Sequence, residues 1–143
     1  MPTIKLFEEL PVWKDARTFA IKIHNLTKKF PKEENYGLTS QVTRATISIG
    51  SNIAEGFDRY SKKDFIRFLI IARGSISEIQ NDLYIALDLK YINQNDFQEA
   101  YALAKDFKDL GKQINGFIKY LRSYDKNNSK DEKINEEYCK YNF

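Results

Sequence analysis

The sequence predicts an all-α protein, folded as an antiparallel up-and-down four-helix bundle. Hydrophobic residues make up 42% of its 143 residues, which is enough to fill one core. No proline follows Pro31, so most of the chain contains no residue that ends a helix outright. Apolar residues also recur at helical intervals in four successive segments with short connections. We expect residues 1–124 to form the bundle and residues 125–143 to form a polar tail.

The first helix is expected over residues 12–29. Pro31 ends the run because the residue before a proline disfavours the helical conformation. Lys28 and Lys29 suit the negative C-terminal end of this helix. Its apolar face consists of Val12, Ala16, Phe19, Ala20, Ile23, Leu26 and Phe30.

The second helix is expected over residues 38–57, with Gly56 near its end as a left-handed cap. One face of this helix is a polar stripe with successive intervals of three or four residues. Apolar residues crowd in between its members, so we expect the stripe to be half buried and to need polar partners. The stripe consists of Gln41, Arg44, Ser48, Asn52, Glu55 and Arg59.

The third helix is expected over residues 61–89, with Ser61 as the N-cap and Asp64 in the first turn. Its apolar residues alternate four and three positions apart, as in a heptad seam. Gly74 and Ser75 are unfavourable inside a helix, so we expect them to allow another helix to approach closely. The seam consists of Phe65, Leu69, Ala72, Ile76, Ile79, Leu83 and Ala86.

The second and third helices should face each other as a hairpin that turns near residues 60 and 61. In that register Arg44 faces Glu78, and Glu55 faces Arg67, which predicts two ion pairs that fix the register. The predicted structural polar network consists of Arg44, Asn52, Glu55, Arg67 and Glu78.

A catalytic cluster is the alternative interpretation of this network, with Glu55 or Glu78 as a general base beside Arg44. No histidine, cysteine or metal-ligand spacing accompanies these residues, so we expect neither an enzyme nor a cofactor or metal site. The single histidine, His24, receives no role.

The fourth helix is expected to begin at Asn93 or Asn95, which can cap it. Its apolar face consists of Phe97, Tyr101, Ala104, Phe107, Ile114, Phe117 and Leu121. A second polar stripe on this helix consists of Lys105, Lys108, Lys112, Asn115, Lys119 and Arg122. Five cations on one face can neutralise the phosphates of RNA or DNA.

A plain solvated face is the alternative interpretation of this second stripe, because Asp106 and Asp109 lie close by and Asp109 can pair with Lys105. The basic surface becomes larger if the first helix lies beside the fourth, since Lys14 and Arg17 then join it. The predicted nucleic-acid-binding residues are Lys14, Arg17, Lys105, Lys108, Lys112, Lys119 and Arg122.

The net charge and the cysteine content limit the expected partners and cellular compartment of the protein. The net charge of +3 is too mild to indicate a polyanion partner by itself. Cys139 has no possible partner for a disulfide within the chain, which favours the reducing cytoplasm. Neither a secretory signal nor an apolar run long enough for a membrane span is visible.

Three segments resemble the four-helix bundle proteins of the bacterial large-subunit ribosomal RNA intervening-sequence family. They read LPVWKDA at 10–16, FPKEENYGLTSQVTRATISIGSNIAEG at 30–56 and RYSKKDFIRFLIIARGSISE at 59–78, and the resemblance covers about residues 10–121. It implies a left-turning up-and-down bundle that assembles into a ring-shaped homo-oligomer, a pentamer. It implies no established enzymatic activity.

The resemblance also implies possible partners. A structurally similar relative is the accessory protein of diversity-generating retroelements, which binds RNA and reverse transcriptase, so a protein-interaction scaffold is the alternative function. This chain has Gly50 where the family often has proline, and Thr43 where it often has arginine or lysine. The missing charge at Thr43 weakens a nucleic-acid role for the second helix.

Overall fold

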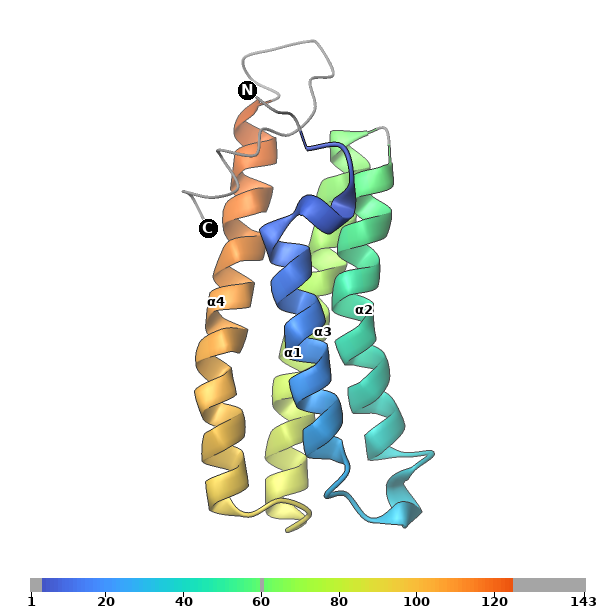
Figure 1. The fold of residues 1–143 in the computed structure, drawn as a ribbon, viewed down its shortest axis with the longest axis vertical. Coiled ribbons are helices and arrows are strands. Elements are labelled where there is room, and N and C mark those ends of the chain that lie inside the picture. Colours follow the sequence, from blue (N-terminus) through green and yellow to red (C-terminus); the bar gives the residue numbers. More distant parts are fainter. Residues whose placement is uncertain (1–3, 60, 125–143) are drawn as a thin grey trace.

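Four long helices form the structure, a computed structural model that describes residues 4–59 and 61–124, without the side chains of residues 96, 97, 99–108 and 124. The helices are α1 (Pro11–Thr27), α2 (Leu38–Asp58), α3 (Lys62–Asp88) and α4 (Gln94–Tyr124), with two short 3-10 helices, η1 (Phe7–Glu9) and η2 (Lys32–Glu34). Consecutive long helices run in opposite directions along the bundle (Figure 1). The prediction of an all-α bundle is confirmed.

The ends of the helices lie close to the predicted positions. Pro11 occupies the first turn of α1, where its missing N–H costs nothing, and the helix ends at Thr27, two residues before the predicted end. Ser61 is the N-cap of α3, as predicted, because its hydroxyl accepts a hydrogen bond of 3.3 Å from the Asp64 N–H. Helix α4 begins directly after Asn93.

Two aromatic contacts tie three of the helices together in the core. The ring of Phe65 in α3 lies edge-on to Phe57 of α2 at 6.0 Å and to Phe117 of α4 at 5.0 Å. Ile49, Leu69 and Ile114, from the same three helices, are fully buried in the same hydrophobic core. Burial of such apolar surface supplies the main driving force for folding.

The N-cap residue of helix α2 is Gly37, and a glutamate from η2 replaces the missing side-chain cap. Gly37 has no side chain to offer, so the Leu38 N–H donates a 2.8 Å hydrogen bond to Glu34 Oε2. The Tyr91 hydroxyl donates another of 2.8 Å to Glu34 Oε1. Both hydrogen bonds lower the pKa of the Glu34 carboxyl group. The bond from the Leu38 N–H has the larger effect, and the bond from the Tyr91 hydroxyl has the smaller one. One carboxylate therefore joins η2, the start of α2 and the connection between α3 and α4.

Helices α2 and α3 pack in the predicted register, with a polar contact at its centre. The hydroxyls of Ser48 and Ser75 lie 3.0 Å apart across the two helices. The Asn52 amide donates to the carbonyl oxygen of Ser48 at 2.7 Å and to its hydroxyl at 2.9 Å. Ser48 and Asn52 are partly buried, so the middle of the polar stripe finds the partners that we expected.

The two ion pairs predicted between these helices are wrong. Glu55 Oε1 pairs at 2.8 Å with Arg59 in its own helix, and Arg67 lies 3.8 Å from Asp64 in α3. Both arginines also lie against the Phe68 ring, at 5.3 and 5.4 Å from its centroid. An ion pair between exposed residues one turn apart in the same helix keeps both side chains in water. A pair that crosses the interface between two helices would lose more of this solvation.

Arg44 and Glu78 are exposed, and they form no ion pair with each other. Their positions lie at the same level of the bundle but outside the line on which Ser48 meets Ser75. The alternative catalytic cluster of Arg44, Glu55 and Glu78 is not formed either, since these three side chains make no hydrogen bond to one another.

Two glycines have roles opposite to those predicted. Gly56 is an ordinary helical residue of α2, not a left-handed cap, and a Cβ there would lie 2.7 Å from Phe65 Cδ2 and 2.8 Å from Phe68 Cβ. Gly56 is therefore the residue that allows α2 and α3 to approach closely. At Gly74 a Cβ would meet nothing within 4 Å, so packing against the described residues does not require this glycine.

The predicted polar tail, residues 125–143, lies outside the described residues, as does Cys139 within it. Among the helices of the described part, none is long and apolar enough to cross a membrane.

The two glycines give a first prediction. Gly56→Ala should lower the free energy of unfolding by about 1–3 kcal/mol, because the new methyl would overlap Phe65 Cδ2 and Phe68 Cβ. Gly74→Ala should raise it by about 0.5–1 kcal/mol, because alanine favours the helix and meets open space. Urea unfolding of both variants in dilute solution measures the difference. Equal effects of the two substitutions would contradict this account.

The Glu34 cap gives a second prediction. A carboxyl group whose folded pKa lies below its unfolded value stabilises the fold above the unfolded pKa, and this contribution disappears as the pH falls through the folded pKa. Wild type should therefore be more stable than Glu34→Gln at pH 7, and the difference should shrink as the pH is lowered to 3. Urea unfolding across this range measures it, with Glu33→Gln as the control. A constant difference at every pH would disprove the electrostatic cap.

Candidate nucleic-acid interface

The polar stripe of α4 lies on the outside of the bundle where the structure describes its side chains. Lys112, Asn115, Lys119 and Arg122 are all exposed. Lys105 and Lys108 lie within α4 at the same intervals of three and four residues, but their side chains are outside the described part. From Lys105 to Arg122 the helix rises about 26 Å at 1.5 Å per residue. The stripe is therefore long enough to touch several phosphates of one nucleic-acid strand.

An arginine of the neighbouring helix joins this stripe. Arg73 in α3 donates a 2.9 Å hydrogen bond from Nη1 to Asn115 Oδ1. The contact places the stripe on the flank of α4 that borders α3, because residues three or four apart share one side of a helix. Sequence reasoning missed Arg73, since the order of residues does not reveal which helix borders the stripe.

We use the term α3/α4 basic face for this composite surface of four cations and one amide. It consists of Arg73, Lys112, Asn115, Lys119 and Arg122. Within the described residues, none of its four cations forms an ion pair with a carboxylate. Arg73 donates to a neutral amide, and no carboxylate of the described residues pairs with its positive charge. Such a face can exchange its mobile counterions for phosphates.

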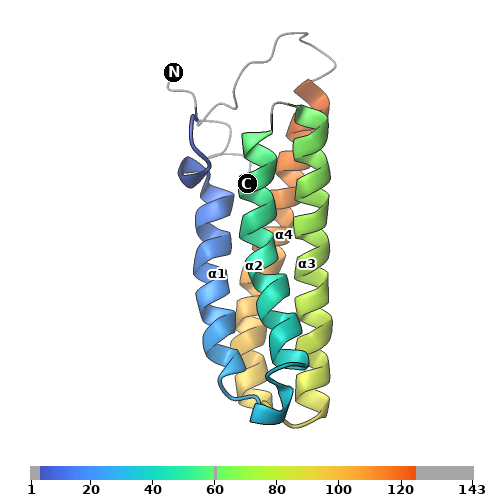
Figure 2. The same cartoon turned by 90° about the vertical axis from the view of Figure 1, so that its right-hand side faces the viewer.

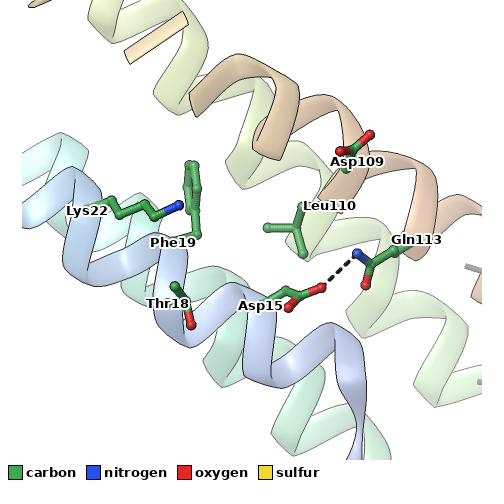
Figure 3. Close-up of a pocket in the computed structure, with 7 residues that line it drawn as sticks. All are labelled: Asp15, Thr18, Phe19, Lys22, Asp109, Leu110 and Gln113. Carbon is green, nitrogen blue, oxygen red and sulfur yellow. Dashed lines mark hydrogen bonds between the residues drawn. The ribbon is translucent and has the colours of Figure 1, made fainter. Parts of the chain in front are cut away.

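The first and fourth helices adjoin, as predicted, but acidic groups lie between them. A hollow of about 190 Å³ opens at their junction (Figure 3). It is lined by Asp15, Thr18, Phe19, Lys22, Asp109, Leu110 and Gln113. The Gln113 amide donates a 2.8 Å hydrogen bond to Asp15 Oδ2 across the junction. The carboxylates of Asp15 and Asp109 therefore interrupt the positive surface at this position.

The predicted contribution of α1 is a separate basic region. Lys14 and Arg17 are exposed, and the guanidinium group of Arg17 lies 5.7 Å from the centroid of the Trp13 ring. They belong to the same helix as Asp15, on the far side of the junction from Lys112. A single continuous basic surface over α1 and α4, as the sequence suggested, is therefore not present at this junction.

The chemistry of the α3/α4 basic face is that of electrostatic attachment. Lysine presents a compact charge on a flexible arm, and arginine presents a planar group that matches a phosphate. Phosphate contacts of this kind fix position without reading sequence.

Comparison with known proteins gives two findings. The family model described as 23S rRNA-intervening sequence protein matches residues 8–116. A crystal structure of a protein of unknown function, from the S23 ribosomal protein family of Bacteroides thetaiotaomicron, has a TM-score of 0.66 and 28% sequence identity. The match covers 76% of this chain and 98% of that one. No curated protein matches the chain.

Proposed function

This chain belongs to the 23S rRNA-intervening sequence protein family, and we propose that it is a non-enzymatic protein that binds nucleic-acid backbones through its α3/α4 basic face. The observation that carries this proposal is a row of exposed cations on two adjoining helices that have no carboxylate partner among the described residues. Arg73 extends the row of Lys112, Lys119 and Arg122 from one helix to two. RNA is the first ligand to test, and DNA shares the same phosphate chemistry.

The affinity of a single chain should be modest and strongly dependent on salt. Each neutralised phosphate releases condensed counterions, so the affinity falls as the salt concentration rises. Lys105 and Lys108 continue the same three- and four-residue spacing in the sequence of α4, and Lys14 and Arg17 form a second, smaller region on α1. Two separate basic regions on one bundle favour a ligand that folds around the protein, such as a structured RNA.

Self-association is the second part of the proposal. The resemblance to the intervening-sequence family implies a ring-shaped homo-oligomer of five chains. A ring would present identical basic faces at fixed spacing, and several weak contacts to one RNA then act together through a high effective concentration. We place the protein in the cytoplasm, where the lone Cys139 would stay reduced.

Charge reversal on the α3/α4 basic face tests the binding. Lys112→Glu combined with Lys119→Glu should weaken the binding of a structured RNA at least tenfold at low salt. It should also reduce the slope of log affinity against log salt concentration by about 2, because two phosphate contacts are lost. Fluorescence titration at several salt concentrations measures both quantities.

A matched variant controls for the change in net charge. Lys28→Glu combined with Lys32→Glu changes the net charge equally but lies at the connection between α1 and α2, outside the α3/α4 basic face. It should bind RNA more tightly than the double variant on α4. An affinity that does not depend on salt, or no binding at low salt, would reject the proposed function.

Light scattering at micromolar concentration tests self-association. We expect a mass several times that of one chain, and a ring of five gives five times that mass. A monomer at these concentrations would remove the second part of the proposal and leave the binding of a single chain to be judged by the titration.

A further inference from the structure

The hollow at the junction of α1 and α4, here called the α1/α4 hollow, is not part of the α3/α4 basic face. The two helices that form it pack against each other along the bundle (Figure 1 and Figure 2). Its volume is about 190 Å³. A protein cavity of about 150 Å³ holds a benzene molecule, so the hollow has room for a small organic ligand.

The lining combines an apolar floor with one carboxylate from each helix. Phe19 of α1 and Leu110 of α4 are each only 2% exposed, and they form the floor. Asp15 of α1 and Asp109 of α4 are exposed and lie on opposite sides of the junction (Figure 3). A ligand that suits this lining has an apolar middle and positive groups toward the two helices.

The two carboxylates are offset along the bundle axis. Asp15 Oδ2 accepts a 2.8 Å hydrogen bond from the Gln113 amide, so Asp15 and Gln113 lie at one level. Asp109 precedes Gln113 by one turn of α4, which displaces it by about 6 Å along the axis. A single small cation therefore cannot contact both carboxylates closely, whereas two cationic groups joined by a short carbon chain can.

The charges of the lining favour a cation at this end of the hollow. Among the side chains that the structure describes, neither Asp15 nor Asp109 forms an ion pair. Gln113 occupies one oxygen of Asp15 and brings no charge. Lys22 lines the hollow on the far side of Phe19 from Asp15 (Figure 3). Its ammonium group repels cations there, so a bound cation is confined to the end that carries the two carboxylates.

We propose that the α1/α4 hollow binds a short aliphatic diamine, the chemical unit of the polyamines. One ammonium group meets Asp15, the other meets Asp109, and the methylene groups between them cover Phe19 and Leu110. A monoamine of the same length reaches only one of the two carboxylates. A divalent metal ion has no apolar part to cover the floor.

Occupancy of the hollow would also change the binding of RNA, and this consequence rests on the proposed function. Asp15 and Asp109 lie between Lys14 and Arg17 on α1 and Lys112 on α4. Their negative charges repel a phosphate backbone that crosses the junction. A bound diamine neutralises them, so one RNA molecule can contact both basic regions.

Titration with putrescine at constant ionic strength tests the site without RNA. The backbone amide signals of Phe19, Leu110 and Gln113 in nitrogen–proton NMR spectra should shift together. For so small a ligand the dissociation constant should be on the order of 1–10 mM.

Matched variants show whether the carboxylates are responsible. Asp15→Asn combined with Asp109→Asn should weaken putrescine binding at least fivefold, and the new amide at position 15 can still accept the hydrogen bond from Gln113. Asp58→Asn combined with Asp88→Asn changes the net charge equally at the ends of α2 and α3. This control should bind putrescine like wild type.

Two further ligands test the diamine specificity. The monoamine n-butylamine should bind at least threefold more weakly than putrescine. Magnesium chloride at the same ionic strength should leave putrescine bound.

A second titration tests the link to RNA. Without amine, the Asp15→Asn, Asp109→Asn variant should bind a structured RNA about threefold more tightly than wild type, because two repulsive charges are gone. Putrescine also binds RNA itself, so the informative quantity is the ratio of the affinities of wild type and variant. That ratio should approach one as putrescine fills the hollow of wild type.

Four results would overturn the inference: no shift of the signals around the hollow, equal putrescine binding by the Asp15→Asn, Asp109→Asn variant, equal binding of putrescine and n-butylamine, or displacement by magnesium. Each of them leaves the proposed function to the titration of the α4 variants. Diamine binding by a protein that does not bind RNA would support the site and reject the proposed function.

Discussion

The close approach of α2 to α3 determines which side chains this bundle buries and which it exposes. Gly56 has no side chain, so Phe65 and Phe68 can lie directly against the backbone of α2. Phe65 then reaches Phe117 of α4 on its other edge, and one residue connects three helices. A larger residue at position 56 would separate the helices and lose these aromatic contacts together with the hydrogen bond between Ser48 and Ser75.

Local sequence features predicted the helices and their pairing well, because each depends on nearby residues. Pro31 and the Ser61 cap limit their helices by the conformation and hydrogen bonding of one or two residues. The register of α2 against α3 follows from a short hairpin, which allows little freedom in the level at which two helices meet. The capping of α2 by Glu34 was not predicted, because it depends on the fold of the preceding connection and on Tyr91 from a distant part of the chain.

The position of a residue around the helix axis was harder to predict than its level along it. Arg44 and Glu78 lie at the predicted level, but they point away from the contact line that Ser48 and Ser75 occupy. The roles of Gly56 and Gly74 were exchanged for the same reason, since both stand in helices and only packing shows which one faces a neighbour. The basic stripe on α4 followed from spacing alone, but Arg73 could be added only once α3 was known to border it.

Self-association would change how strongly the α3/α4 basic face holds RNA. A single α3/α4 basic face offers few phosphate contacts, and each contact weakens as salt rises, so one chain alone would release RNA readily at cellular ionic strength. Self-association through a surface other than the basic face would add further basic faces without covering Arg73 or the lysines of α4. The gain in avidity would come from geometry, because a second face already held near the RNA binds without the full entropic cost of a new encounter. An oligomer that used the basic face for its own contacts would lose this advantage.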